Sequence, residues 1–133
     1  MAIGSAINAK LLGTAGVSAI CSTRGFPDVL PNNATLPAYV YTTISDIPAY
    51  QMGGEAGVAT ARVQIDCYAA TRKDCDALAA AIRTAISGQR FTQGSYKIRT
   101  CHIDNAFTDE DQPIDGTQAW RYLTITDFLI NYV

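Results

Sequence analysis

Residues 58–69 read VATARVQIDCYA, and the alternation within this stretch decides the fold. Its odd-numbered positions from Val63 to Cys67 are apolar, while its even-numbered positions from Arg62 to Asp66 are polar. A two-residue period places the two sets on opposite faces of an extended chain. The stretch therefore predicts a β-strand with one face toward a core and one face toward solvent or a partner.

The sequence on both sides of this strand predicts an antiparallel sheet. Residues 38–45 (AYVYTTIS) are β-branched and aromatic, and residues 46–54 (DIPAYQMGG) supply turn formers, so 38–69 is expected to form a long hairpin. Residues 95–106 (SYKIRTCHIDNA) alternate as a third strand, and residues 119–133 (AWRYLTITDFLINYV) form a long final strand.

Two helices are expected to accompany the sheet. Residues 3–20 place apolar side chains near one face, and a second helix begins at Thr71, whose hydroxyl can cap the amide three residues later, and ends before Gly88. The segment 23–37 is rich in proline and asparagine and reads as an irregular crossing loop. The expected fold class is α+β: one domain over residues 1–133, with an antiparallel sheet, a long β-hairpin and two helices packed on one face.

Composition excludes several function classes. The net charge of −2 gives no field that would gather nucleic acid, and 17% charged residues is low for a soluble domain, for which about 25% is typical. The apolar N-terminal stretch contains Lys10 and lacks a basic start, so neither a signal peptide nor a membrane span is expected. The chain is expected to stay in the cytoplasm where it is made. The four cysteines lack metal spacing and are expected to be buried free thiols, at positions Cys21, Cys67, Cys75 and Cys101.

The final strand carries large apolar side chains on both faces. Leu123, Ile125 and Leu129 point one way, whereas Phe128 and Tyr132 point the other way. Two helices cover only one side of a sheet, so something else must cover the other side. A neighbouring copy of the chain and the 23–37 loop are equally good candidates on pattern alone.

The order of motifs from Pro37 to Gly88 resembles a known family. PAYVYTTIS, then PAYQMGGEAGVATARVQIDCYAAT, then the helix CDALAAAIRTAISG are similar to the phage tail-completion family, although Cys67 and Tyr68 depart from the usual end of the strand motif. The resemblance implies a ring of copies, usually six, that acts as a tail terminator: it caps the tail tube protein and offers a docking face to the head connector. It also implies that viral DNA passes through the channel without specific binding and that the protein resides in the virion neck. Because the candidate ligands lack suitable spacing and no apolar stretch is long enough to span a bilayer, neither a cofactor nor a membrane partner is expected.

Enzymatic chemistry has little support in the sequence. His102 is the sole histidine, and its neighbour Cys101 points to the opposite face of the strand, so a nucleophile and base pair is not expected. The alternatives to a terminator are a head-side connector component, or a small cytoplasmic ligand-binding domain or enzyme with a site under the 23–37 loop. In the enzyme case the catalytic residues would have to include His102, Asp66 or Asp104.

Charged clusters are read as solvated or paired groups. Five acids gather late in the chain but lack the calcium-loop pattern, so no metal is expected and residues 107–116 are read as an acidic turn; the five are Asp104, Asp109, Glu110, Asp111 and Asp115. In a ring this turn could face the channel and repel DNA. Four basic residues are expected to pair with acids or neighbouring subunits, namely Arg62, Lys97, Arg99 and Arg121.

The expected sites are therefore interfaces. The turn from Asp46 to Glu55 is predicted to be a mobile, projecting hairpin tip that orders when a neck partner docks, because its glycines loosen the backbone and its apolar residues are adaptable. No catalytic, metal or cofactor residues are assigned. The residues expected at subunit or partner interfaces are Tyr50, Met52, Arg62, Gln64, Arg121, Phe128 and Tyr132.

Overall fold

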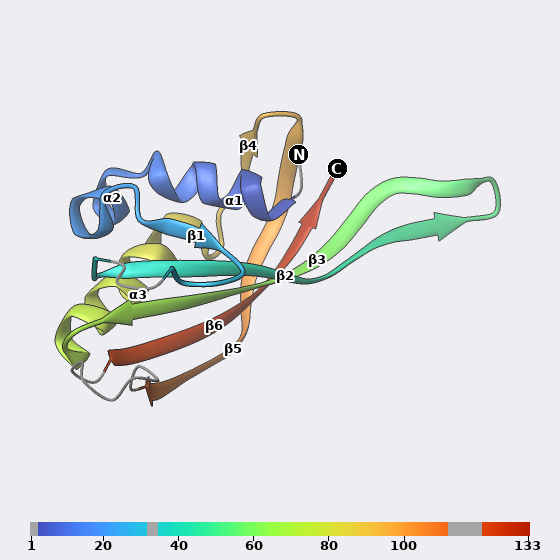
Figure 1. The fold of residues 1–133 in the computed structure, drawn as a ribbon. Helices are drawn as coiled ribbons and strands as arrows, with labels where there is room; N and C mark the ends of the chain where they lie inside the picture. Colours follow the sequence, from blue (N-terminus) through green and yellow to red (C-terminus); the bar gives the residue numbers. More distant parts are fainter. Residues whose placement is uncertain (1–2, 32–34, 112–120) are drawn as a thin grey trace.

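A computed structural model describes residues 3–31, 35–111 and 121–133 as a mixed sheet with helices on one side (Figure 1). The sheet order is β1-β2-β3-β6-β5-β4, and all neighbours are antiparallel except β1 and β2. This confirms the α+β class. The elements in chain order are α1 (Ile3–Leu12), α2 (Ala15–Cys21), β1 (Gly25–Pro27), β2 (Ala38–Gln51), β3 (Gly54–Ala69), α3 (Arg72–Ile86), β4 (Phe91–Gln93), β5 (Tyr96–Asp111) and β6 (Arg121–Tyr132).

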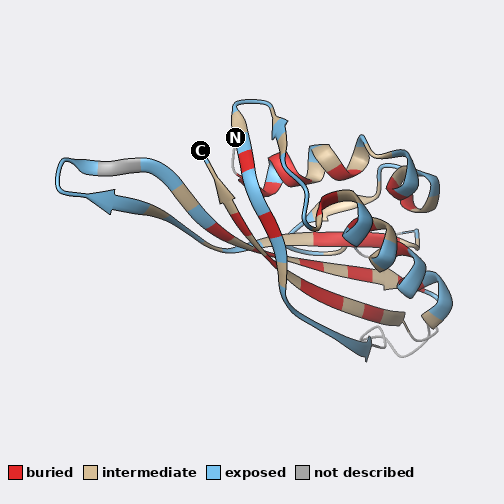
Figure 2. Cartoon of the chain, turned by 180° about the vertical axis from the view of Figure 1, so that it is seen from behind, coloured by how far each residue is buried: buried red, intermediate tan, exposed pale blue. Residues whose placement is uncertain are grey.

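The helices and one face of the sheet enclose a single core (Figure 2). Val63, Ile65 and Cys67 of β3 face the helices, as their alternation predicted, and each is at most 1% exposed. From the helices, Ile7 and Leu78 join the same core and are fully buried. The opposite, polar face of β3 is the side of the sheet that the helices leave open.

The expected first helix is two helices. α1 ends at Leu12 and α2 begins at Ala15, and the two are bent by 85°. The break lies at Gly13 and Thr14. Glycine loses more backbone entropy than other residues when it becomes helical, so Gly13 is a weak point in a continuous helix. Within the described residues no single helix has the length and hydropathy to span a membrane, although α1 and α2 reach that measure as a bent pair.

The helix α3 follows its sequence signals closely. The Thr71 hydroxyl accepts a hydrogen bond from the Asp74 backbone amide at 3.1 Å, which is the predicted cap. Cys75, Leu78, Ile82 and Ile86 are its buried residues, spaced as one helical stripe.

Two predicted loops contain strand. Gly25–Pro27 of the expected crossing loop forms β1, which pairs in parallel with residues 39–41 of β2. Phe107–Asp111 of the expected acidic turn continues β5, because residues 121–125 of β6 offer it an unbroken partner. The acidic-turn prediction is therefore wrong over residues 107–111, and Asp115 lies outside the described residues.

Candidate interaction surfaces

The β2–β3 hairpin extends far beyond the sheet body as a two-stranded ribbon (Figure 1). The last pair between β3 and β6 joins Ala59 to Tyr132, and Gln51 pairs with Gly54 at the tip. We call residues 47–58 the arm. Residues 46–51 were expected to be turn; they are strand up to the Met52–Gly53 turn.

Large apolar side chains of the arm stand in solvent. Met52 at the tip is fully exposed, Tyr50 is 71% exposed and Ile47 is 62% exposed, and Val58 is exposed on the second strand. An isolated two-stranded ribbon is marginally stable in water, and exposed apolar groups of this size mark contact surfaces. The arm is therefore a candidate contact surface.

The base of the arm is fixed to the last strand. The Tyr132 hydroxyl donates to Asp46 Oδ1 at 2.6 Å, and the Tyr132 ring packs edge-on against Tyr96 with ring centroids 5.3 Å apart. One residue earlier, Asn131 accepts from Thr60 at 2.7 Å. Burial, and then the Asp46 carboxylate, raise the pKa of Tyr132, so this hydroxyl remains a donor across the physiological range.

A polar cluster lies on the open face of the sheet. Arg62 Nη1 is 2.6 Å from Asp104 Oδ2 and 3.7 Å from Asp127 Oδ2. Further along β3, Gln64 Nε2 donates to Asp66 Oδ1 at 3.0 Å. Two carboxylates thus lie within 4 Å of the one guanidinium, which leaves a surplus of negative charge in this cluster.

The Asp66 carboxyl has a raised pKa. Burial is the main cause, and the nearby Asp127 charge adds to it, whereas the Gln64 hydrogen bond acts in the opposite direction. The ionised form of Asp66 is therefore less favourable here than it is in water. A cationic group that approached the open face would reduce the free-energy cost of ionising Asp66.

The predicted interface residues are dispersed over the sheet. Tyr50 and Met52 lie on the arm, and Arg62 and Gln64 lie in the polar cluster. Arg121 begins β6, with its guanidinium 5.4 Å from the Tyr68 ring centroid. Tyr132 is half-buried at the base of the arm.

Phe128 lies in the core of the chain, in contrast to its predicted place at an interface. It is 1% exposed and belongs to the core cluster beneath the helices, so it is not available to a neighbouring subunit. The two faces of β6 were predicted correctly, but the face of Phe128 is the one that the helices cover. On the other face Leu123 and Ile125 are 8% and 9% exposed, so their own chain covers most of them.

The residues weighed for chemistry are dispersed. His102 is exposed on β5 and pairs with Leu129 of β6. Asp66 of β3 pairs with Ile125, which lies four residues before Leu129 on β6. Four strand residues separate them by roughly 13 Å. Asp104 is occupied by Arg62. The arrangement gives a histidine base no carboxylate partner among these candidates.

The candidate metal ligands also diverge. Asp109 and Glu110 are successive strand residues that pair with Leu123 and Tyr122, so they point to opposite faces of the sheet. The Asp109 backbone carbonyl instead accepts from Arg72 Nη2 at 2.9 Å.

Several residues of these candidate surfaces were not predicted from the sequence. Ile47 was assigned to a turn and Val58 to the start of a strand, although an exposed apolar residue beside turn formers is a signal that could have found them. Asp127 could not be found from pattern, because its place beside Arg62 depends on how β3 and β6 pair.

Comparison with known proteins gives the family. The family model described as Tail completion protein gp17 matches residues 5–123. No curated protein matches the chain. Among solved structures, a chain of the "Virion of native gene transfer agent (GTA) particle" has a similar fold, with a TM-score of 0.67 and 15% identity over 99% of this chain and 96% of that chain. The family match spans most of the sequence, and this protein therefore belongs to the tail completion protein gp17 family, as a structural protein of the phage virion tail.

Proposed function

We propose that copies of this protein form a six-membered ring in the virion neck, which closes the finished tail tube and joins it to the head connector. The observation that carries the proposal is the arm, a ribbon with exposed apolar side chains that a solitary chain leaves uncovered. The protein acts by assembly: it stops the addition of tube subunits and presents a docking face to the head.

The polar cluster suits the channel of such a ring. Its carboxylates outnumber its guanidinium group, so it repels the phosphates of DNA. A wall of this kind lets viral DNA pass without being held. This supports a passive role toward DNA.

Inactivation of the gene in the phage that encodes this protein tests the proposal. We expect filled heads and separate tails in the lysate, visible by electron microscopy, and tails of irregular length if the ring stops tube growth. Purified protein added to that lysate should restore joined particles. Joined, infectious particles without this protein would refute the proposal, and heads that lose their DNA would instead indicate the head-side connector role.

A further inference from the structure

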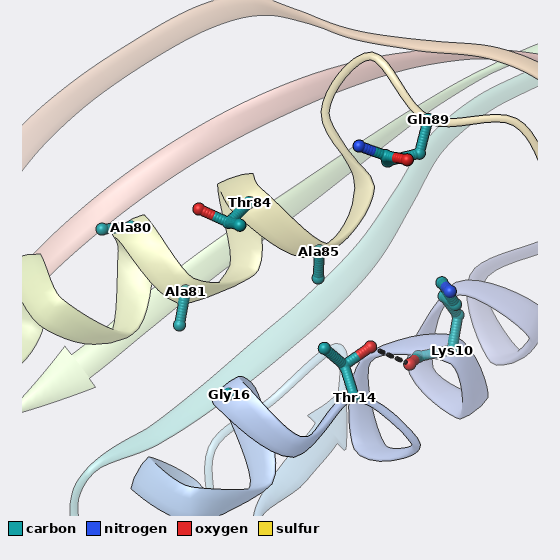
Figure 3. Close-up of a pocket in the computed structure, with 8 residues that line it drawn as sticks. All are labelled: Lys10, Thr14, Gly16, Ala80, Ala81, Thr84, Ala85 and Gln89. Atoms are coloured by element: carbon teal, nitrogen blue, oxygen red, sulfur yellow. Dashed lines mark hydrogen bonds between the residues drawn. The ribbon is translucent and has the colours of Figure 1, made fainter.

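A groove separates the N-terminal helices from α3 (Figure 3). It is an open cavity of about 550 Å³, and most of its lining residues are small; they are Lys10, Thr14, Gly16, Ala80, Ala81, Thr84, Ala85 and Gln89. The Thr14 hydroxyl donates to the Lys10 carbonyl at 2.8 Å, which fixes the bend between α1 and α2 at the edge of the groove. Because alanine and glycine side chains fill little space, an open hollow remains at the surface where these helices meet.

The groove has the size and lining to receive large apolar side chains. Sites that enclose small molecules measure roughly 300–1,000 Å³, so this cavity accepts the side chains of a hairpin tip. Gly16 leaves open space: a Cβ added there meets no atom within 4 Å. The same chain thus carries both an open groove and an arm with exposed apolar side chains.

The arm carries the matching groups. Met52 is fully exposed at the tip, and Tyr50, 71% exposed, lies close behind it. Methionine adapts its shape to irregular apolar gaps. The arm, residues 47–58, contains one acidic residue, Glu55, and no basic one, while Lys10 is the charged residue that lines the groove. The arm therefore brings exposed apolar side chains and a net negative charge to a groove lined by a single cation.

The arm does not reach the groove of its own chain. It leaves the sheet on the side away from α2 and α3 (Figures 1 and 2). A contact between two different surfaces of identical chains is head-to-tail, and such contacts generate rings when the rotation closes. The geometry points to a second copy as the occupant.

We infer that the arm of each copy inserts Tyr50 and Met52 into the groove between the N-terminal helices and α3 of the next copy. This inference rests on the proposed ring and names the contact that builds it. It replaces the neck partner expected from the sequence as the surface that receives the hairpin tip.

A substitution that fills the groove tests the inference. Gly16→Phe places a large side chain in open space, so the monomer should keep its helix content and unfolding temperature. Ring assembly should weaken by about tenfold or more, because a few central side chains carry most of the binding energy of an interface. The matched Gly16→Ala variant should assemble normally. On the arm, Met52→Asp should weaken assembly and Met52→Leu should preserve it.

Cross-linking measures the contact itself. The Gly16→Cys and Met52→Cys variants, mixed and treated with a short bismaleimide, should give linked dimers that neither variant gives alone. The four native cysteines are buried and compete little for the reagent.

The outcomes separate the inference from the proposed function. Normal rings from Gly16→Phe with no linked dimers in the mixture would overturn the inference and leave the ring standing. Normal rings that no longer join heads to tails would overturn it in favour of a neck protein in the groove. Wild-type protein that remains monomeric in solution and in virions would overturn both.

Discussion

The hydroxyl of Tyr132 donates a 2.6 Å hydrogen bond to the carboxylate of Asp46, and this contact joins the end of the chain to the base of the arm. Asp46 lies on β2 directly before the arm, and Tyr132 is the last residue of β6. The two residues are 86 positions apart in the sequence. The direction in which the arm leaves the sheet therefore depends on the final strand.

Replacing Tyr132 by phenylalanine should loosen this base. Removal of the hydroxyl leaves Asp46 to water, and a hydrogen bond to a charged group contributes about 1.5–3 kcal/mol at most, less where solvent reaches it. We expect a drop in stability of about 1 kcal/mol or below, measured by urea unfolding, together with weaker ring assembly. Unchanged assembly would mean that the arm needs no support from the last strand.

Alkaline pH should act on the same contact. The pKa of Tyr132 is raised in the folded protein above its value in the unfolded chain, so the folded state holds the proton more tightly. Its stabilising contribution is complete below pH 10 and declines as pH rises above that value. The wild type should lose stability above pH 10 more steeply than Tyr132→Phe. Parallel pH profiles would contradict the assignment.

Asp66→Asn should stabilise the monomer at neutral pH. The pKa of Asp66 is raised by burial, so its stability contribution is present below pH 4 and declines as pH rises and the folded carboxyl ionises. Asparagine retains an oxygen for Gln64 Nε2 and removes that cost. Thermal unfolding at pH 4 and pH 7 measures the difference, and a variant less stable than wild type at pH 7 would contradict the prediction.

Phe128→Ala should destabilise the monomer, and any loss of ring assembly should follow from that lower stability alone. Phe128 is 1% exposed in the core, and truncation of a buried phenylalanine costs about 3–5 kcal/mol. Met52→Ala, at a fully exposed position, should change monomer stability by less than about 0.5 kcal/mol. Denaturant unfolding of both variants checks the pair, and a stable Phe128→Ala monomer would place this side chain outside the core.

Arg72→Lys should detach α3 from the sheet edge. Arg72 Nη1 donates to the Leu123 carbonyl and Nη2 to the Asp109 carbonyl, both at 2.9 Å, and the guanidinium lies 5.2 Å from the Tyr122 ring centroid. A lysine ammonium cannot reproduce this planar arrangement. We expect a loss of about 1–2 kcal/mol in unfolding free energy, and faster amide hydrogen exchange in residues 107–111. Exchange equal to that of the wild type would show that β6 alone holds this strand.

The sequence predicted the elements with strong local signals. Three such predictions are confirmed: the Thr71 cap, the apolar stripe of α3 and the two faces of β6. The cap depends on residues close in sequence, and the stripe and the faces depend only on the periods of helix and strand. The paired arm was missed because Pro48 lacks a backbone donor and usually ends a strand. In the structure β2 pairs with β1 only at residues 39–41, so at Pro48 it is an edge strand, and its register with β3 shifts between Pro48 and Tyr50; edge strands and such irregularities are where sheets tolerate proline.

The remaining errors concern relationships between elements. Alternation showed that Phe128 and Leu123 face opposite ways, but it could not show which face the helices cover. The groove likewise depends on how α1 and α2 pack against α3, which no local pattern encodes. The family resemblance rested on the order of motifs, and this is why it succeeded where single residues did not.

A cryo-electron microscopy reconstruction of the virion neck would show both the ring and the contact that builds it. We expect six copies of this 14.2 kDa chain in a ring at the head-proximal end of the tail tube, each with its arm seated between the N-terminal helices and α3 of the next copy. A neck in which this chain is absent, or is present as a single copy without contact to another, would contradict it.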